Sequence, residues 1–283
     1  MTINSNRLFQ LFKYAVYTLL AINVFVFWHE EIQAAAIQFP DGVPLSLIIG
    51  FFPSSIDTAA WVVLLLMFEL ETYVLEDHHY TPKITWSLHG MRVLCYAFIV
   101  YAFYGYAVKL DFIYQATQMG HVADLCALVA DGWSYATDLD EYTLLTSANC
   151  STFPAVGEMF RFANMNALVD VAGLQDIRHL AWVDVINAAA WLLIVVVLEI
   201  DVRLQDHNRY QGLPLRASYA AKLILYPMLF LAAVFWGFKG DFVDFWDAFL
   251  WIVAFAFIEL NIFEWSQETR TTQTQVPATS TSN

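Results

Sequence analysis

Eight charged residues of this chain lie within apolar stretches, where an ionised group is costly. They are five acids and three bases: Glu69, Glu71, Glu199, Asp201, Glu259, Lys13, Arg92 and Lys222. A charge at the centre of a bilayer costs at least about 2.5 kcal/mol, so such residues are expected to face one another or a polar pathway rather than lipid. We therefore predict that the eight form one layer across a helix bundle, and we take this layer as the candidate functional site.

The predicted layer holds two more acids than bases. Carboxylates that are kept from water and that no base neutralises hold a proton or bind a cation. The surplus favours the hypothesis that the chain moves a small cation or a proton through the layer. The alternative is a static ring of ion pairs that sets the register of the helices, with the surplus acids reaching water at the inner surface.

The helices that carry these charges recur along the chain. Within single predicted apolar runs, a tryptophan followed eight residues later by an acid occurs three times, and so does a base followed four residues later by a tyrosine. The sets are Trp61 with Glu69, Trp191 with Glu199, Trp251 with Glu259, Lys13 with Tyr17, Arg92 with Tyr96, and Lys222 with Tyr226. We predict three helical hairpins around a pseudo-threefold axis along the membrane normal, with the tryptophans as a structural belt near the outer surface.

Composition places these hairpins in a membrane. The 283 residues are 59% hydrophobic and only 14% charged, whereas soluble domains are about 25% charged. A helix needs about 20 apolar residues to cross a bilayer core of roughly 30 Å. Runs of this kind occupy residues 8–28, 56–75, 86–108, 185–204, 217–238 and 245–265. The predicted fold class is an all-α integral membrane protein with six transmembrane helices, arranged as three pseudo-repeated hairpins.

The apolar runs divide the chain into four parts. Residues 1–109 hold the first three helices, with an outer loop at 29–55, and residues 185–268 hold the last three. Residues 110–184 form an insertion between them. Residues 269–283 are rich in threonine, glutamine and serine without periodicity, so we predict a disordered cytoplasmic tail.

The insertion is expected to be a small α-rich lobe outside the cytoplasm. Residues 113–130 and 156–174 have mainly helical character, with a polar and acidic stretch between them. Cys126 and Cys150 both lie in this lobe. An oxidising exterior favours a disulfide between them, and a pair of free thiols is the alternative.

Lysine and arginine are concentrated on one side of the predicted topology. Nine of the thirteen lie on the side that holds both termini, which the positive-inside rule makes cytoplasmic. Most acids lie on the other side, and the net charge is −14. Such a face repels nucleic acid and attracts cations, although a surface adapted to a salty exterior is the alternative. We predict a protein embedded in the lipid bilayer of a bacterial inner membrane, with no nucleic-acid partner.

Signs of enzymatic chemistry are weak. Glu76, Asp77, His78 and His79 lie together on a predicted inner link and could ligate a metal. Membrane di-iron enzymes need more histidines, so we interpret these as interfacial residues. The sequence also lacks a glycine-rich phosphate loop, a Gly-x-Ser-x-Gly motif and a Cys-x-x-Cys pair. We expect no catalytic residues, no metal and no cofactor.

A second functional hypothesis is non-catalytic. The acidic insertion could dock a membrane-protein partner or a second copy of the chain, which would make the protein an accessory or assembly subunit of a larger membrane complex. Transporters usually interrupt helices near the midplane, but these runs contain little beyond Gly105, Pro227 and Gly237 that would do so. Smooth helices of this kind favour a scaffold.

Overall fold

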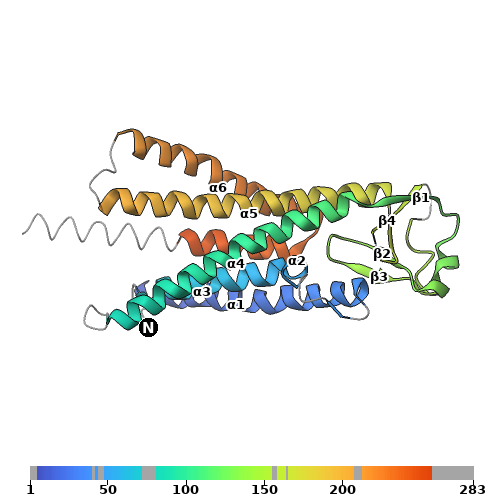
Figure 1. Cartoon of the computed structure of the whole chain (residues 1–283), viewed down its shortest axis with the longest axis horizontal. Helices are drawn as coiled ribbons and strands as arrows, with labels where there is room; N and C mark the ends of the chain where they lie inside the picture. The colour runs from blue at the N-terminus through green and yellow to red at the C-terminus, as the bar shows by residue number, and fades with distance from the viewer. Residues whose placement is uncertain are drawn as a thin grey trace, which may run out of the picture.

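The computed structural model is a helical bundle with a small β-sheet lobe at one end (Figure 1). It describes residues 5–39, 42–43, 48–71, 81–154, 158–163, 165–206 and 212–256. The first helix, α1 (Ser5–Gln38), starts at the end of the bundle that lies away from the lobe (Figure 1). Positions along the bundle are therefore given relative to its lobe end and its amino-terminal end.

The bundle consists of helices that run along its length (Figure 1). After α1 they are α2 (Ile48–Phe51), α3 (Pro53–Glu69), α4 (Pro82–Tyr114), α5 (Val171–Asp206), α6 (Leu213–Lys239) and a helical stretch at 242–256. Among the described residues, four stretches are long and apolar enough to cross a membrane: Arg7–Ile37, Pro82–Tyr114, Val171–Asp201 and Leu213–Lys239. The other two predicted spans correspond to α3, which has 17 residues, and to residues 242–256. The predicted end of the last span, at 265, and the tail lie outside the described residues.

Local sequence explains where several helices begin and end. Pro53 and Pro82 each open a helix, at a position where the missing N–H costs no hydrogen bond. Helix α6 ends at Lys239 and is followed by Gly240, whose φ of +89° lies in the left-handed region that glycine adopts without steric cost. This turn leads directly into residues 242–256, so α6 and that stretch form a helical hairpin.

Apolar side chains fill the centre of the bundle. Helix α3 packs against α1 and α4, and α5 packs against α4 and α6. Leu20, Ile194 and Ala254 are fully buried in one cluster, to which Trp61 and Trp191 also belong. Helices from both halves of the chain therefore share one core.

The insertion contains a β-sheet, and the prediction that it is α-rich is wrong. Its strands are β1 (Thr117–His121), β2 (Ser134–Ala136), β3 (Tyr142–Leu144), β4 (Glu158–Arg161) and β5 (Ala167–Asp170), and Leu125–Asp131 forms a 3₁₀ helix, η4. The order in the sheet is β1-β4-β5-β2-β3. Only the β2–β5 pair is parallel among the pairings of these strands.

The strands escaped prediction because they are short. Strands β2 and β3 have three residues each, which is too few to reveal an alternation of buried and exposed side chains. Helix α4 stops at Tyr114, and the chain then passes through Gly120 and Gly132 with φ of +86° and +66°. The left-handed backbone at Gly120 is incompatible with a continuous helix over 113–130.

The predicted disulfide between Cys126 and Cys150 is confirmed. It connects η4 to the turn that follows β3. Close to it, a small core formed by Leu125, Trp133 and Met159 packs one part of the lobe. Because a lobe of this size buries little apolar surface, the covalent link is a substantial part of its stability.

Candidate functional site

The bases of the predicted charged layer each contact an acid on a neighbouring helix. The N–O distances are 2.6 Å for Lys13–Glu69, 2.7 Å for Arg92–Glu71 and 3.0 Å for Lys222–Asp201. The first pair joins α3 to α1, the second joins α4 to Glu71, two residues beyond the end of α3, and the third joins α5 to α6. Each buried or half-buried base is therefore neutralised by a carboxylate.

The remaining acids of the predicted layer lie elsewhere. Glu199 is exposed and contacts Arg203 on its own helix at 3.1 Å, and Glu259 lies outside the described residues. Within the described part of the layer, acids and bases therefore balance when Arg203 is counted. The hypothesis of surplus charge at this level stays a prediction that depends on Glu259.

Two carboxylates of the layer keep an oxygen without a partner. Glu69 Oε2 and Asp201 Oδ1 are buried and accept no hydrogen bond. The other oxygens are occupied: Tyr14 donates to Glu69 Oε1 at 3.1 Å, and Ser218 donates to Asp201 Oδ2 at 2.6 Å. Each of these oxygens is free to accept a further hydrogen bond.

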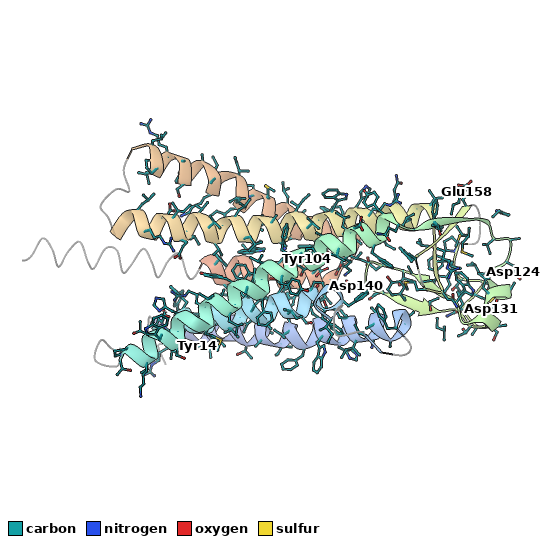
Figure 2. All side chains as sticks on the ribbon, in the orientation of Figure 1. Tyr14, Tyr104, Asp124, Asp131, Asp140 and Glu158 are labelled. Atoms are coloured by element: carbon teal, nitrogen blue, oxygen red, sulfur yellow. A yellow bond between two sulfur atoms is a disulfide. The ribbon has the colours of Figure 1, made fainter. Side chains whose placement is uncertain are left out.

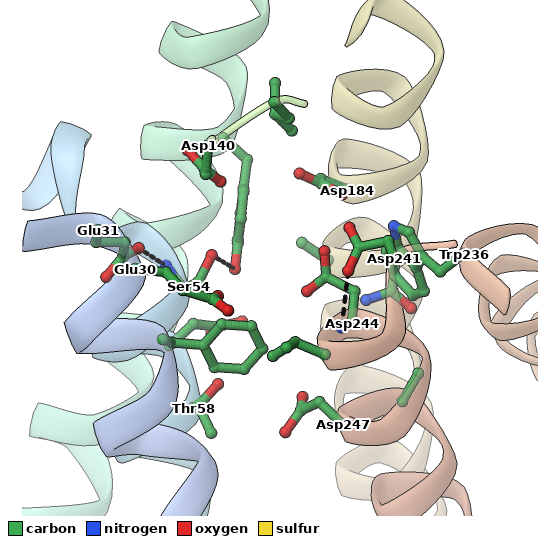
Figure 3. Close-up of a pocket in the computed structure, with 18 of the residues that line it drawn as sticks. Glu30, Glu31, Ser54, Thr58, Asp140, Asp184, Trp236, Asp241, Asp244 and Asp247 are labelled. Atoms are coloured by element: carbon green, nitrogen blue, oxygen red, sulfur yellow. Dashed lines mark hydrogen bonds between the residues drawn. The ribbon is translucent and has the colours of Figure 1, made fainter. Parts of the chain in front are cut away.

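A larger concentration of acids lies at the lobe end of the bundle, around a cavity of about 290 Å³ (Figure 3). Ten carboxylate residues line it: Glu30, Glu31, Asp57, Asp138, Asp140, Glu141, Asp184, Asp241, Asp244 and Asp247. Among the described residues that line the cavity there is no lysine, arginine or histidine. We call this space the acidic cavity.

Several elements contribute to the walls of the acidic cavity. Figure 3 shows Glu30 and Glu31 of α1 on one side, facing Asp184 of α5 across the space. Asp244 and Asp247, from the stretch at 242–256, lie on the same side as Asp184 (Figure 3). The loop between β2 and β3 adds acids from the lobe. The cavity thus exists only where the bundle and the lobe meet.

Two of these carboxylates accept hydrogen bonds from a different helix. Glu31 lies near the carboxyl end of α1, where the helix dipole disfavours a negative charge. It is stabilised by the amino end of α3, because Ser54 N–H donates to Glu31 Oε1 at 2.8 Å and Ser55 N–H donates to Oε2 at 3.2 Å. Asp247 accepts a hydrogen bond from Asn23 Nδ2 at 2.8 Å. These contacts hold the side chains in place.

Lys109 forms an ion pair with one of these acids. Its Nζ contacts Asp140 Oδ2 at 2.5 Å. This ion pair involves one of the ten carboxyl groups, and the described residues that line the cavity supply no other base.

Three tryptophans close the cavity on the side of the bundle core. The ring centroids of Trp61, Trp191 and Trp251 lie 6.0, 6.1 and 6.4 Å apart, with interplanar angles of 57°, 63° and 64°. All three line the cavity and are buried. They were expected to form a belt near the membrane surface, but they meet inside the bundle because they lie on the core-facing sides of their helices. We call them the tryptophan floor.

Two polar atoms at the cavity have no hydrogen-bond partner. Trp236 is only 4% exposed, and its indole N–H is unpaired. Asn187 Oδ1 is buried and also unpaired. Both residues line the acidic cavity, so a bound molecule or water there could satisfy one donor and one acceptor.

The electrostatic environment is clearest at Asp138, in the lobe. Burial raises the pKa of Asp138 to about 6, and repulsion from Asp241, Glu141 and Asp140 adds to the rise. The backbone N–H of Leu139 donates to Asp138 Oδ1 and acts in the opposite direction. Burial and the neighbouring carboxylates thus together favour the protonated form of Asp138.

Sequence reasoning missed this cavity because each acid had a local explanation. Acids such as Asp57 and Asp247 follow closely on the helix starts expected from the sequence, where the dipole would stabilise them. The useful signal was their position in the repeat, since Asp57, Asn187 and Asp247 each precede an aligned tryptophan by four residues. These three aligned positions, together with the acidic loop at 138–141, predict acids that converge at one level of the bundle.

Other predicted features fall outside the described residues. The possible inner-link ligands Glu76, Asp77, His78 and His79 are among these. Comparisons with protein-family models, with curated proteins and with solved structures find no match. The function is therefore inferred from the site itself.

Proposed function

We propose that this chain is a six-span membrane protein that takes up a small cation from the outer side into the acidic cavity and moves it, or protons in exchange, across the membrane. The observation that supports this most is the gathering of ten carboxylates, with no base among the described lining residues, around one cavity. The lobe is placed outside and both termini in the cytoplasm, because lysine and arginine are concentrated on the side of the termini.

The charge of the cavity carries the proposal. Carboxylates that share a low-dielectric space raise the free energy of one another's ionised form, so positive charge must enter or protons must bind. A cavity lined by one sign of charge also concentrates counter-ions from solution. Both effects favour a small cation as the ligand.

A route across the membrane would continue past the tryptophan floor. Beneath the floor lie tightly packed apolar residues, including Leu20 and Ala254. Beyond them are the paired carboxylates of the layer, two of which have a vacant oxygen. The described arrangement corresponds to a state that is closed below the cavity, and transport requires the helices to separate at the floor, as in alternating access.

Flux through vesicles tests the proposal. The purified protein is reconstituted, and the movement of protons, sodium, potassium, magnesium, calcium and small organic cations is followed. Asp247→Asn should reduce flux by removing a cavity charge while keeping the oxygen that accepts from Asn23. Glu69→Gln should reduce flux at the layer, and Asp131→Asn, at the far tip of the lobe (Figure 2), should have no effect. If the wild-type protein moves none of these ions, transport is refuted.

One observation favours the accessory hypothesis as a second candidate. Strand β1 is an edge strand of the lobe, and its residues are mostly exposed. Open edges can pair with a strand from a partner. In this case a mild-detergent preparation should retain a stoichiometric membrane-protein partner and lose it when β1 carries Met119→Pro. A monodisperse protein with measurable flux would contradict this candidate.

A further inference from the structure

We infer that the ligand of the acidic cavity is a short aliphatic polyamine rather than a single bare metal ion. This inference rests on the proposed function, because it assumes that the cavity binds a cation. It adds the chemical class of that cation, from the size of the cavity, the spacing of its acids and the nature of its floor.

The carboxylates are too widely spread for a compact metal site. Metal ions such as calcium are held by several oxygen ligands at about 2.3 to 2.6 Å from one centre. Within the described part of the chain, no group of three or more histidine, cysteine, aspartate or glutamate side chains is arranged to hold a metal ion. The cavity, at about 290 Å³, also approaches the roughly 300 Å³ at which pockets for small organic molecules begin.

The position of the acids on opposite walls fits a ligand with more than one charge. Glu30 lies on the α1 side, whereas Asp184 and Asp244 lie across the cavity (Figure 3). An ammonium group donates up to three hydrogen bonds and accepts none, so carboxylates are its natural partners. Two ammonium groups joined by a methylene chain could contact both walls at once.

The tryptophan floor matches the carbon chain and the charge of such a ligand. Organic cations are attracted to the faces of aromatic rings, and tryptophan is the most effective of them. The rings of Trp61, Trp191 and Trp251 are steeply inclined to one another rather than stacked. Methylene groups can pack against these rings, whereas a hydrated metal ion gains little from them.

The two unpaired polar atoms are consistent with the same ligand. Asn187 Oδ1 can accept a hydrogen bond directly from an ammonium group. The indole N–H of Trp236 can donate to a water molecule that also accepts from the ligand. A polyamine with one bridging water would therefore satisfy both atoms.

Calorimetric titration of the full-length protein in detergent tests the inference. The probes are putrescine, spermidine, tetramethylammonium, sodium, magnesium and calcium, each at constant ionic strength. We expect spermidine to bind more tightly than the others. Asp184→Asn should weaken spermidine binding about tenfold or more, since a hydrogen bond to a charged group is lost. Asp131→Asn, which lies away from the cavity (Figure 2), should leave it unchanged.

A pair of substitutions at Trp191 separates the aromatic contribution from simple packing. Trp191→Phe keeps a ring, and Trp191→Leu removes it while leaving an apolar side chain of similar size to phenylalanine. We expect spermidine affinity to fall at least about threefold more in the leucine variant than in the phenylalanine variant. Thermal unfolding of both variants shows that each is folded.

The outcomes distinguish this inference from the proposed function. Binding of calcium, magnesium or sodium that depends on Asp184, without binding of polyamines, overturns the inference and leaves the cation function standing. Tighter binding of tetramethylammonium than of spermidine, or spermidine binding that Asp184→Asn and Trp191→Leu do not change, also overturns it. If no cation binds, both the inference and the proposed function fail.

Discussion

The buried ion pair between Lys13 and Glu69 allows a sharp prediction about stability. Their charged atoms are 2.6 Å apart, and the two side chains are 0% and 8% exposed. Lys13→Met removes the base and leaves a buried carboxylate without its counter-charge, which costs about 3 to 5 kcal/mol. At about 2 to 4 °C per kcal/mol for a large domain, the melting temperature should fall by roughly 10 °C.

The double variant and a matched pair complete this test. Glu69→Gln combined with Lys13→Met removes both charges and should recover most of the lost stability, because no unpaired charge remains. The Arg92–Glu71 pair is 35% and 25% exposed, so Arg92→Met should cost no more than about 1 kcal/mol. Differential scanning fluorimetry in one detergent measures all the variants. Equal losses for Lys13→Met and Arg92→Met would refute the reasoning from burial.

Three further predictions concern the lobe, the cavity and the start of α5. Cys126→Ser opens a disulfide whose cysteines are 24 positions apart, and the lobe should lose about 3 kcal/mol, seen as faster proteolysis. Since burial raises the pKa of Asp138 to about 6, protons compete with a bound cation below that pH. Cation affinity measured by calorimetry should therefore fall between about pH 7 and pH 5, and Asp138→Asn should weaken this dependence. Gly173→Ala would place a Cβ 2.6 Å from Val169 Cγ2, so it should cost about 1 to 3 kcal/mol in thermal unfolding, whereas Gly90→Ala, with open space around it, should not destabilise.

The long apolar helices and the disulfide could be predicted from the sequence. The membrane-length apolar helices followed from composition, and the Cys126–Cys150 bond followed from two cysteines in one insertion. A charge in an apolar run is costly, so the sequence also predicted that Lys13 would pair with an acid. It did not predict that this acid would be Glu69, because Glu69 is 56 positions away and the choice depends on which helices are neighbours.

The sheet and the acidic cavity could not be read from local pattern. Strands of three residues, such as β2 and β3, carry no detectable period. The cavity depends on the lobe lying against the end of the bundle, so that Asp140 lines the same space as Asp184 and Asp244 (Figure 3). Each acid has an ordinary role in its own segment, and only the three-dimensional arrangement shows the accumulated charge.

The most direct test of cation binding in the acidic cavity is an electron cryomicroscopy map of the protein in a lipid nanodisc with saturating spermidine. We predict continuous density above the tryptophan floor, in contact with the carboxylates of Asp184 and Asp244, and its loss in Asp184→Asn. Density for the cation only on the outer surface of the lobe, with an unchanged water-filled cavity, would contradict the proposal.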